Sequence, residues 1–171
     1  TDLRDEKMIS LGKLAAGLAH ELNNPASAAK RDAEELTTAL TVADDSARAL
    51  GAAGLSADQR AELDAVRSFC LRSTNHRPLT GLPLSDREDA LAVWLEEHGI
   101  SDTHAEELAR TPLSFDLLDR LARAFQGAPL DAALRWIISG YAARTLVADI
   151  ERATARIHAL VAATKGFTHM D

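Results

Sequence analysis

Apolar residues in the first fifty positions recur at the spacing of an amphipathic helix. Four leucines fall within about 80° of one another on a helical wheel and so form a single stripe. These are Leu11, Leu14, Leu18 and Leu22. The pattern predicts one long helix over about residues 3–50, and Gly51 and Gly54 are expected to end it.

Short apolar segments with helix-capping residues fill the middle of the chain. Ser56 with Gln59, and Ser85 with Glu88, match the capping-box pattern, in which two side chains satisfy backbone N–H groups at a helix start. Ser101 and Ser114 are further N-cap candidates, and residues 76–84 are expected to form a loop. Gly99, Pro112 and Gly127 are expected to end the short helices that precede them. The helix that follows Ser56 is expected to direct four residues inward, namely Leu63, Val66, Phe69 and Cys70.

A second long helix is predicted from about residue 130 to about 166. Pro129 suits its first turn, and Gly140 is its one weak point. Seven residues form a stripe within about 100° on the wheel. They are Leu146, Ile150, Ala153, Ile157, Leu160, Val161 and Thr164. A hairpin of two helices has little interior, so pairing two hairpins would bury both stripes; alternatively, the middle block covers them in a monomer.

These elements predict an all-α fold, in which a long antiparallel helical hairpin forms a dimeric four-helix bundle. The expected divisions are a first bundle helix (1–50), an inserted helical subdomain (51–128) and a second bundle helix (129–171). The middle block is too rich in Leu, Trp and Phe to be a flexible linker. We therefore expect it to be a small packed subdomain.

Composition and charge exclude several classes of function. The net charge is −7 with interspersed acids and bases, which argues against a nucleic-acid partner. The single cysteine, Cys70, is typical of a reducing compartment, so a cytoplasmic location is expected. No apolar run is long enough to cross a bilayer and the charged start does not look like a signal peptide, so no membrane contact is expected in this segment.

His20 is the residue whose surroundings point to chemistry. It lies about 165° from the centre of the leucine stripe on the wheel, so it is expected to face solvent. A carboxylate at Glu21 can accept the proton on Nδ1 and leave Nε2 as a nucleophile toward a phosphoryl group. Asn24 shares the His20 face and could orient a water. The alternatives are a surface histidine, a solvated charge at Glu21 and a helix cap at Asn24.

Pro25 bears on the shape of the helix beside His20, and the spacing of the histidines bears on whether His20 could bind a metal. Pro25 removes the hydrogen bond to the carbonyl of Glu21 and is expected either to bend the helix beside His20 or to break it. A zinc-protease helix needs a second histidine four residues after the first, and Asn24 occupies that position. No metal site is therefore expected, and five other histidines are assigned surface or capping roles: His76, His98, His104, His158 and His169.

The stretch Leu11–Pro25, which reads LGKLAAGLAHELNNP, closely resembles the H-box of sensor histidine kinases. The segments Ile150–Val161 and Lys165–Asp171 resemble the second helix of the same family and its end. The resemblance implies a histidine protein kinase fragment in which His20 accepts the γ-phosphoryl group of ATP and passes it to an aspartate on a response-regulator receiver domain. It also implies that Glu21 accepts the proton, that Asn24 contributes to dephosphorylating the regulator, and that two chains form a homodimer.

Two features depart from that family. The family usually joins its two helices by a short loop, whereas residues 51–128 separate them here. The family's ATP-binding domain carries glycine-containing boxes, and no two glycines of this sequence are spaced G-x-G. This segment is therefore expected to bind no cofactor and to be inactive on ATP alone, with ATP and Mg handled by a kinase ATP-binding domain as a partner. The alternatives are a non-catalytic dimerisation or binding scaffold, with exposed aromatics in the insert, and a stand-alone phosphotransfer relay module.

Overall fold

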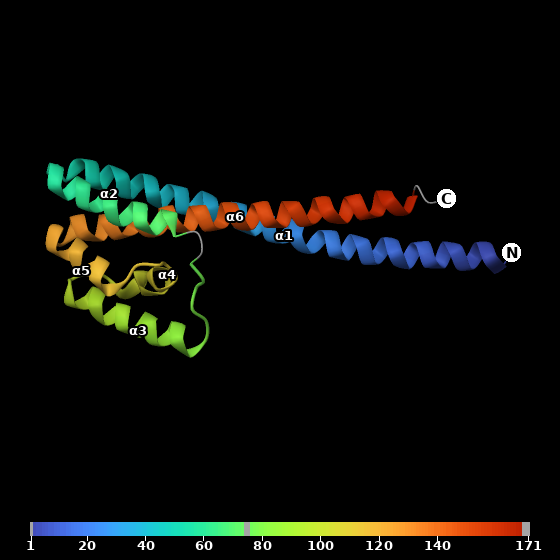
Figure 1. Ribbon diagram of the computed structural model, residues 1–171, viewed down its shortest axis with the longest axis horizontal. Helices are drawn as coiled ribbons and strands as arrows, with labels where there is room; N and C mark the ends of the chain where they lie inside the picture. Colours follow the sequence, from blue (N-terminus) through green and yellow to red (C-terminus); the bar gives the residue numbers. More distant parts are fainter. Residues whose placement is uncertain (1, 74–75, 169–171) are drawn as a thin grey trace. The chain divides into compact units, whose positions relative to one another are not determined.

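The structure, a computed structural model, describes residues 2–73 and 76–168, and within these ranges it contains helices and no strand. In chain order the helices are α1 (Asp2–Ala52), α2 (Ala57–Arg72), α3 (Leu82–Glu97), the 3-10 helix η1 (Asp102–His104), α4 (Ala105–Ala109), α5 (Phe115–Ala124) and α6 (Ala128–Thr168) (Figure 1). The prediction of an all-α fold is confirmed.

The chain forms two compact units. The first, here called the arm unit, comprises Thr1–Leu36 and Thr145–Asp171. The second, called the core unit, comprises Thr37–Arg144. The division falls inside α1 and α6, so the core unit contains the expected insert together with parts of both long helices.

Helix α1 continues through Pro25 without a break. The expected alternative, in which Asn24 caps a new helix, is therefore wrong. A proline in a helix interior costs about 3 kcal/mol because it lacks an N–H and crowds the preceding turn. Burial of the Pro25 ring offsets part of this cost.

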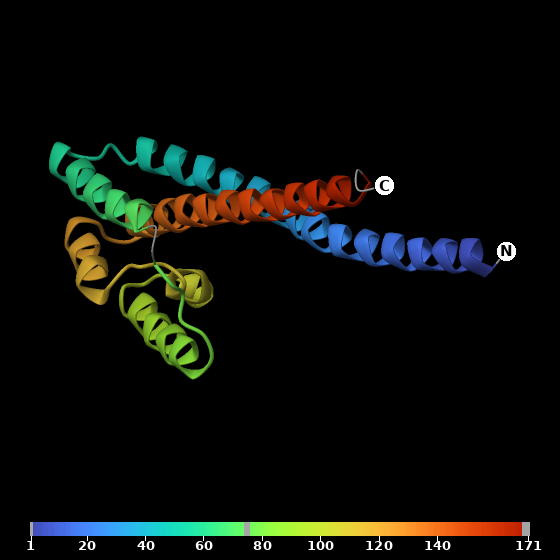
Figure 2. The ribbon, with the colours of Figure 1, turned by 45° about the vertical axis from the view of Figure 1, so that its right-hand side comes forward.

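The two arms of the arm unit lie side by side and share a seam (Figures 1 and 2). The buried and half-buried residues on α1 are spaced alternately four and three residues apart, and so are those on α6. This is the spacing of helices packed in a left-handed supercoil. On α1 they include Leu18, Leu22, Pro25, Ala29, Asp32 and Leu36; on α6 they include Leu146, Ile150, Ala153, Ile157, Leu160 and Thr164. Val161, expected in this stripe, is instead 41% exposed, and Leu11 and Leu14 lie outside the described side chains.

Helix starts in the core unit follow the capping signals with one exception. Ser56 and Gln59 form the expected capping box, and Ser101 and Ser114 each accept a backbone hydrogen bond at a helix start. Helix α3, however, begins at Leu82 and not after Ser85. Its N-cap is Gly81 with φ of 63°, a conformation that glycine adopts without the steric cost of a side chain.

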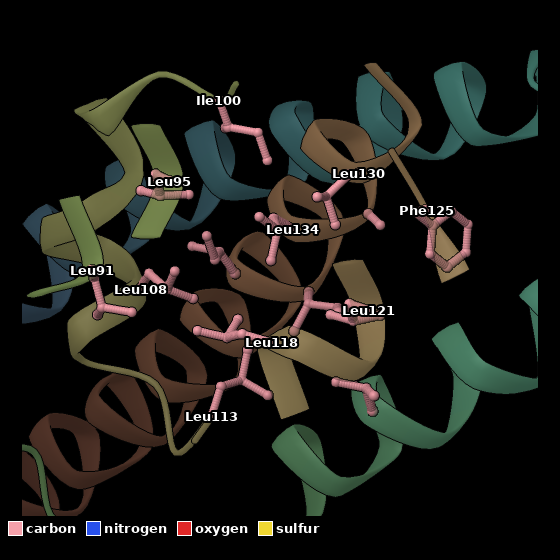
Figure 3. Close-up of a cluster of buried hydrophobic side chains, with 14 of the residues drawn as sticks. Leu91, Leu95, Ile100, Leu108, Leu113, Leu118, Leu121, Phe125, Leu130 and Leu134 are labelled. Atoms are coloured by element: carbon pink, nitrogen blue, oxygen red, sulfur yellow. The ribbon is translucent and has the colours of Figure 1, made fainter. Parts of the chain in front are cut away.

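A continuous hydrophobic core holds the core unit together (Figure 3). Its fully buried side chains come from α2, α3, α4 and α5, from the segments that join them and from the first turns of α6, and they include Leu91, Leu95, Leu108, Leu113, Leu118, Leu121, Phe125, Leu130, Leu134 and Ile137. Leu63, Val66 and Cys70 point inward as predicted, whereas Phe69 is 43% exposed and the prediction for it was wrong. The scaffold alternative expects exposed aromatic residues in the insert. Besides Phe69, Phe115 is 37% exposed, whereas Trp94 and Phe125 are buried.

Polar contacts fix α3 against the segments that follow it. The Arg87 guanidinium donates from Nε to the carbonyl of Ala109 at 3.1 Å and from Nη2 to the carbonyl of Leu113. The Trp94 indole donates to Asp119 Oδ1 at 2.9 Å. Arg87 is also the only basic residue in the segment 82–109, which carries eight acidic side chains. These hydrogen bonds therefore fix the strongly acidic segment 82–109 to the part of the core unit that follows it.

Candidate functional site

His20 lies on α1 with its imidazole exposed to solvent, as the helical wheel predicts. Its neighbours Leu18 and Leu22 are half-buried in the seam of the arm unit. The leucines therefore fix the rotation of the helix, and this rotation directs His20 outward. The side chain is free to meet a second protein.

Glu21 and Asn24 are also exposed, but they point in different directions from the helix axis. Asn24 is four residues further along, so it lies on the His20 face one turn away, while Glu21 points about 100° around the helix. Within the described part of the chain, none of these three side chains forms a hydrogen bond or an ion pair. The structure thus brings His20 and Asn24 to one face and leaves the Glu21 carboxylate beside it.

The backbone next to His20 has two unusual features. Pro25 has no N–H, so the carbonyl oxygen of Glu21 receives no helical hydrogen bond from residue 25. On the other side, Gly17 is exposed, and a Cβ placed on it would meet nothing within 4 Å. The approach to the imidazole is therefore open on the N-terminal side, and the helical ladder is weakened on the C-terminal side.

Three histidines of the core unit are engaged in packing. His76 lies edge-on to Tyr141, His98 stacks on Trp94 at 4.0 Å between ring centroids, and the His104 Nε2 atom lies 3.3 Å from Asp131 Oδ1. His158, on α6 in the arm unit, is exposed like His20 but is flanked by Ile157 and Ala159 and not by a carboxylate. His169 lies outside the described residues. Among the histidines that the structure describes, His20 therefore differs from the others in combining exposure with an adjacent acid.

Neither a reactive cysteine nor a metal cluster is indicated in the described part of the chain. Burial raises the pKa of the Cys70 thiol to about 12, so the reactive thiolate is not formed near neutral pH. Within residues 2–73 and 76–168, no three metal-binding side chains come together. Among the same residues, no helix is long and apolar enough to span a membrane.

The core unit contains a pocket of about 310 Å³ that the sequence pattern did not reveal. It lies where the end of α1, the start of α2 and α6 meet, and Arg60 and Trp136 contribute to its lining. These two residues are 76 positions apart in the chain, so only the fold brings them together. No spacing signal in the sequence could have paired them.

Comparisons with known proteins do not assign the chain: no family model, curated protein or solved structure matches it. A functional hypothesis therefore depends on the residues of the arm unit and their geometry.

Proposed function

We propose that this chain is the phosphoacceptor and dimerisation region of a two-component sensor histidine kinase, with His20 as the phosphorylated residue. The observation that carries the proposal is the exposed imidazole on the outer face of α1, followed by Glu21, Asn24 and Pro25 in the order of an H-box. The ATP-binding domain that supplies the phosphoryl group is a separate partner in this proposal.

The proposed reaction balances at named atoms. The Nε2 lone pair of His20 attacks the γ-phosphorus of ATP, the bond from that phosphorus to the bridging oxygen breaks, and ADP leaves. Glu21 accepts the proton from Nδ1 as positive charge develops on the ring. An aspartate carboxylate of a receiver domain then attacks the phosphorus, the N–P bond breaks, and the imidazole recovers its proton.

Dimerisation fits the incomplete burial of the arms. Leu18, Leu22, Ile150 and Ile157 remain only half-buried when α1 packs against α6. Since burial of apolar surface contributes about 25 cal/mol per Å², a second hairpin would gain free energy by covering the open side of this seam. We infer that two chains form a four-helix bundle through the arm unit, which places one His20 on each chain.

The proposal is tested by phosphorylation with a purified kinase ATP-binding domain, Mg²⁺ and γ-labelled ATP. A label on the chain that is stable in alkali and lost in acid is expected, because a phosphoramidate hydrolyses in acid. His20→Gln should abolish this label. His158→Gln, which removes the other exposed histidine described in the arm unit, should retain it. Equal labelling of the His20→Gln chain, or no labelling of the unsubstituted chain, would contradict the proposal and favour a binding scaffold.

Asn24→Ala is expected to slow the dephosphorylation of a receiver domain without slowing the phosphorylation of His20. Its amide is one turn from His20 on the same face of α1, and in this proposal it orients a water molecule and takes no part in the bond changes at Nε2. Loss of a positioning contact can slow a step by about 10²-fold. We therefore expect roughly 10- to 100-fold slower dephosphorylation of a receiver aspartate, with His20 labelling unchanged. Asn23→Ala, at the neighbouring exposed position, is the matched control, and an equal effect of both substitutions would exclude a specific role for Asn24.

A further inference from the structure

Helix α3 presents a second face to solvent, opposite the face that packs into the core. In Figures 1 and 2 the helix lies at the outer edge of the core unit. Leu82 is 79% exposed and Val93 is 55% exposed, and the two lie within about 20° of each other on the helical wheel. The fully buried Leu91 lies on the opposite side of the helix. Large apolar side chains on an unpartnered face indicate a surface that another molecule covers.

Carboxylates occupy the same face between and beyond the two apolar residues. Four exposed acids lie within about 60° of Leu82 on the wheel: Asp86, Asp89, Glu96 and Glu97. Within the described part of the chain, none of these carboxylates forms an ion pair. We call this surface, made of Leu82, Asp86, Asp89, Val93, Glu96 and Glu97, the outer face of α3.

The one base of the acidic segment 82–109 does not compensate the outer face. Arg87 is directed toward the segments that follow α3, where its guanidinium donates hydrogen bonds to the carbonyls of Ala109 and Leu113. Eight acids and one base give the segment a net charge of −7, which equals that of the whole chain. The outer face therefore carries much of the uncompensated charge of the protein.

The charge and the spacing of the outer face decide which partner it fits. The phosphate groups of nucleic acids and of anionic lipids would be repelled, and so would α3 of a second copy of the chain. From Leu82 to Val93 the outer face follows spacings of four, three and four residues, along which one helix packs against another. Opposite charge and helical spacing together favour a basic amphipathic helix.

We propose that the outer face of α3 docks an amphipathic helix of a partner protein that is rich in lysine and arginine. The apolar side chains of that helix contact Leu82 and Val93, and its cations pair with the carboxylates beside them. Exposed charge pairs contribute more to orientation and association rate than to affinity, so the association is weak and reversible. Every residue of the outer face belongs to the core unit, so the inference is independent of the phosphoacceptor role of His20.

The test uses the whole chain and three model peptides of about 18 residues, long enough to span α3 as a helix. In the lysine peptide, leucines recur at alternating spacings of about four and three residues, and lysine and alanine fill the other positions. The glutamate peptide has glutamate at every lysine, and the scrambled peptide has the composition of the lysine peptide without a leucine stripe. Binding is followed by NMR at about 0.15 M salt, at which charges more than about 8 Å apart are largely screened.

The lysine peptide should give saturable shifts of the α3 amides and of the methyl groups of Leu82 and Val93. The glutamate peptide should give none, because the outer face repels it. The scrambled peptide should bind at least about fivefold more weakly, because its leucines cannot contact both apolar residues from one side. Absence of saturable shifts with the lysine peptide, shifts confined to the arm unit, or equal affinities of the lysine and scrambled peptides would each overturn the proposal.

Charge substitutions separate the outer face from the net charge of the chain. One variant neutralises three acids of the outer face: Asp86→Asn, Asp89→Asn and Glu97→Gln. The control neutralises three exposed acids of α1 and α6: Glu35→Gln, Asp44→Asn and Glu151→Gln. The first should weaken binding of the lysine peptide at least about fivefold, and the control should change it less than about twofold. Equal effects of the two variants would show attraction to net charge alone and would overturn the proposal.

Apolar substitutions test the other part of the outer face. Leu82→Ala combined with Val93→Ala should weaken binding of the lysine peptide at least about fivefold, since its leucines lose their contacts. The matched control is Leu40→Ala combined with Val147→Ala, a leucine and a valine that are 53% and 43% exposed on the long helices. The control should leave the affinity unchanged, and both variants should keep the helical spectrum, because the substituted side chains are exposed. An unchanged affinity after the first pair of substitutions would overturn the proposal.

Discussion

Replacing Glu21 with glutamine is expected to slow phosphorylation of His20 by about 10²-fold or more, the usual contribution of a general base. The substitution keeps the size and hydrogen-bonding capacity of the side chain and removes its ability to accept the Nδ1 proton. The carboxylate lies beside His20 on the exposed surface of α1 and has no partner of its own among the described residues. In the proposed reaction, its negative charge is therefore available to the imidazole.

The measurement is the initial rate of label incorporation at saturating ATP-binding domain, so that docking does not limit the rate. Glu35→Gln removes another exposed carboxylate of α1 and should leave the rate unchanged. Transfer from phosphorylated His20 to a receiver domain can be followed with the same variant. A Glu21→Gln rate within twofold of the unsubstituted chain would contradict the role proposed for Glu21 as the proton acceptor.

Replacing Leu118 with alanine is expected to lower the free energy of unfolding of the core unit by about 2–5 kcal/mol. Leu118 is fully buried on α5 among leucines from other helices (Figure 3). Truncation removes apolar contacts and leaves a cavity that closely packed neighbours fill only in part. This loss is a large share of the total stability of a small domain.

Urea unfolding followed by tryptophan fluorescence provides the measurement, because Trp94 and Trp136 both belong to the core unit. The matched control is Leu40→Ala, at a side chain 53% exposed on the part of α1 in the same unit. Its effect should stay within about 0.5 kcal/mol, as for most surface substitutions. A loss for Leu118→Ala as small as that expected for Leu40→Ala would show that the core does not depend on the packing of Leu118.

Features set by one helix and its own periodicity were predictable from the sequence. The exposure of His20 needs only the 3.6-residue repeat and the leucine stripe. The capping box at Ser56 is equally local, because its two hydrogen bonds join residues three positions apart. In both cases the physical cause lies within a few residues of the feature, so a pattern in the chain is sufficient to reveal it.

Features decided by packing between helices were missed. Phe69 lies about 60° beyond Val66 at the edge of the inward face of α2, so its burial depends on which helix covers that edge. The start of α3 was missed for a local reason: Gly81 and Pro83 begin the helix, and the Ser85 N–H already donates to the Gly81 carbonyl at 3.1 Å. Packing between helices also hid the pocket, since Arg60 and Trp136 meet only after the core has formed.

The uneven distribution of charge has a consequence for the solubility of the chain. The acidic segment 82–109 carries eight acids and one base, and the other residues carry eighteen of each. A shortened chain without α3, η1 and α4 would therefore have no formal net charge at neutral pH. Polypeptides near their isoelectric point tend to associate and precipitate. We therefore expect the shortened chain to be less soluble than the full one at neutral pH, because this segment supplies the net negative charge through which copies of the chain repel one another.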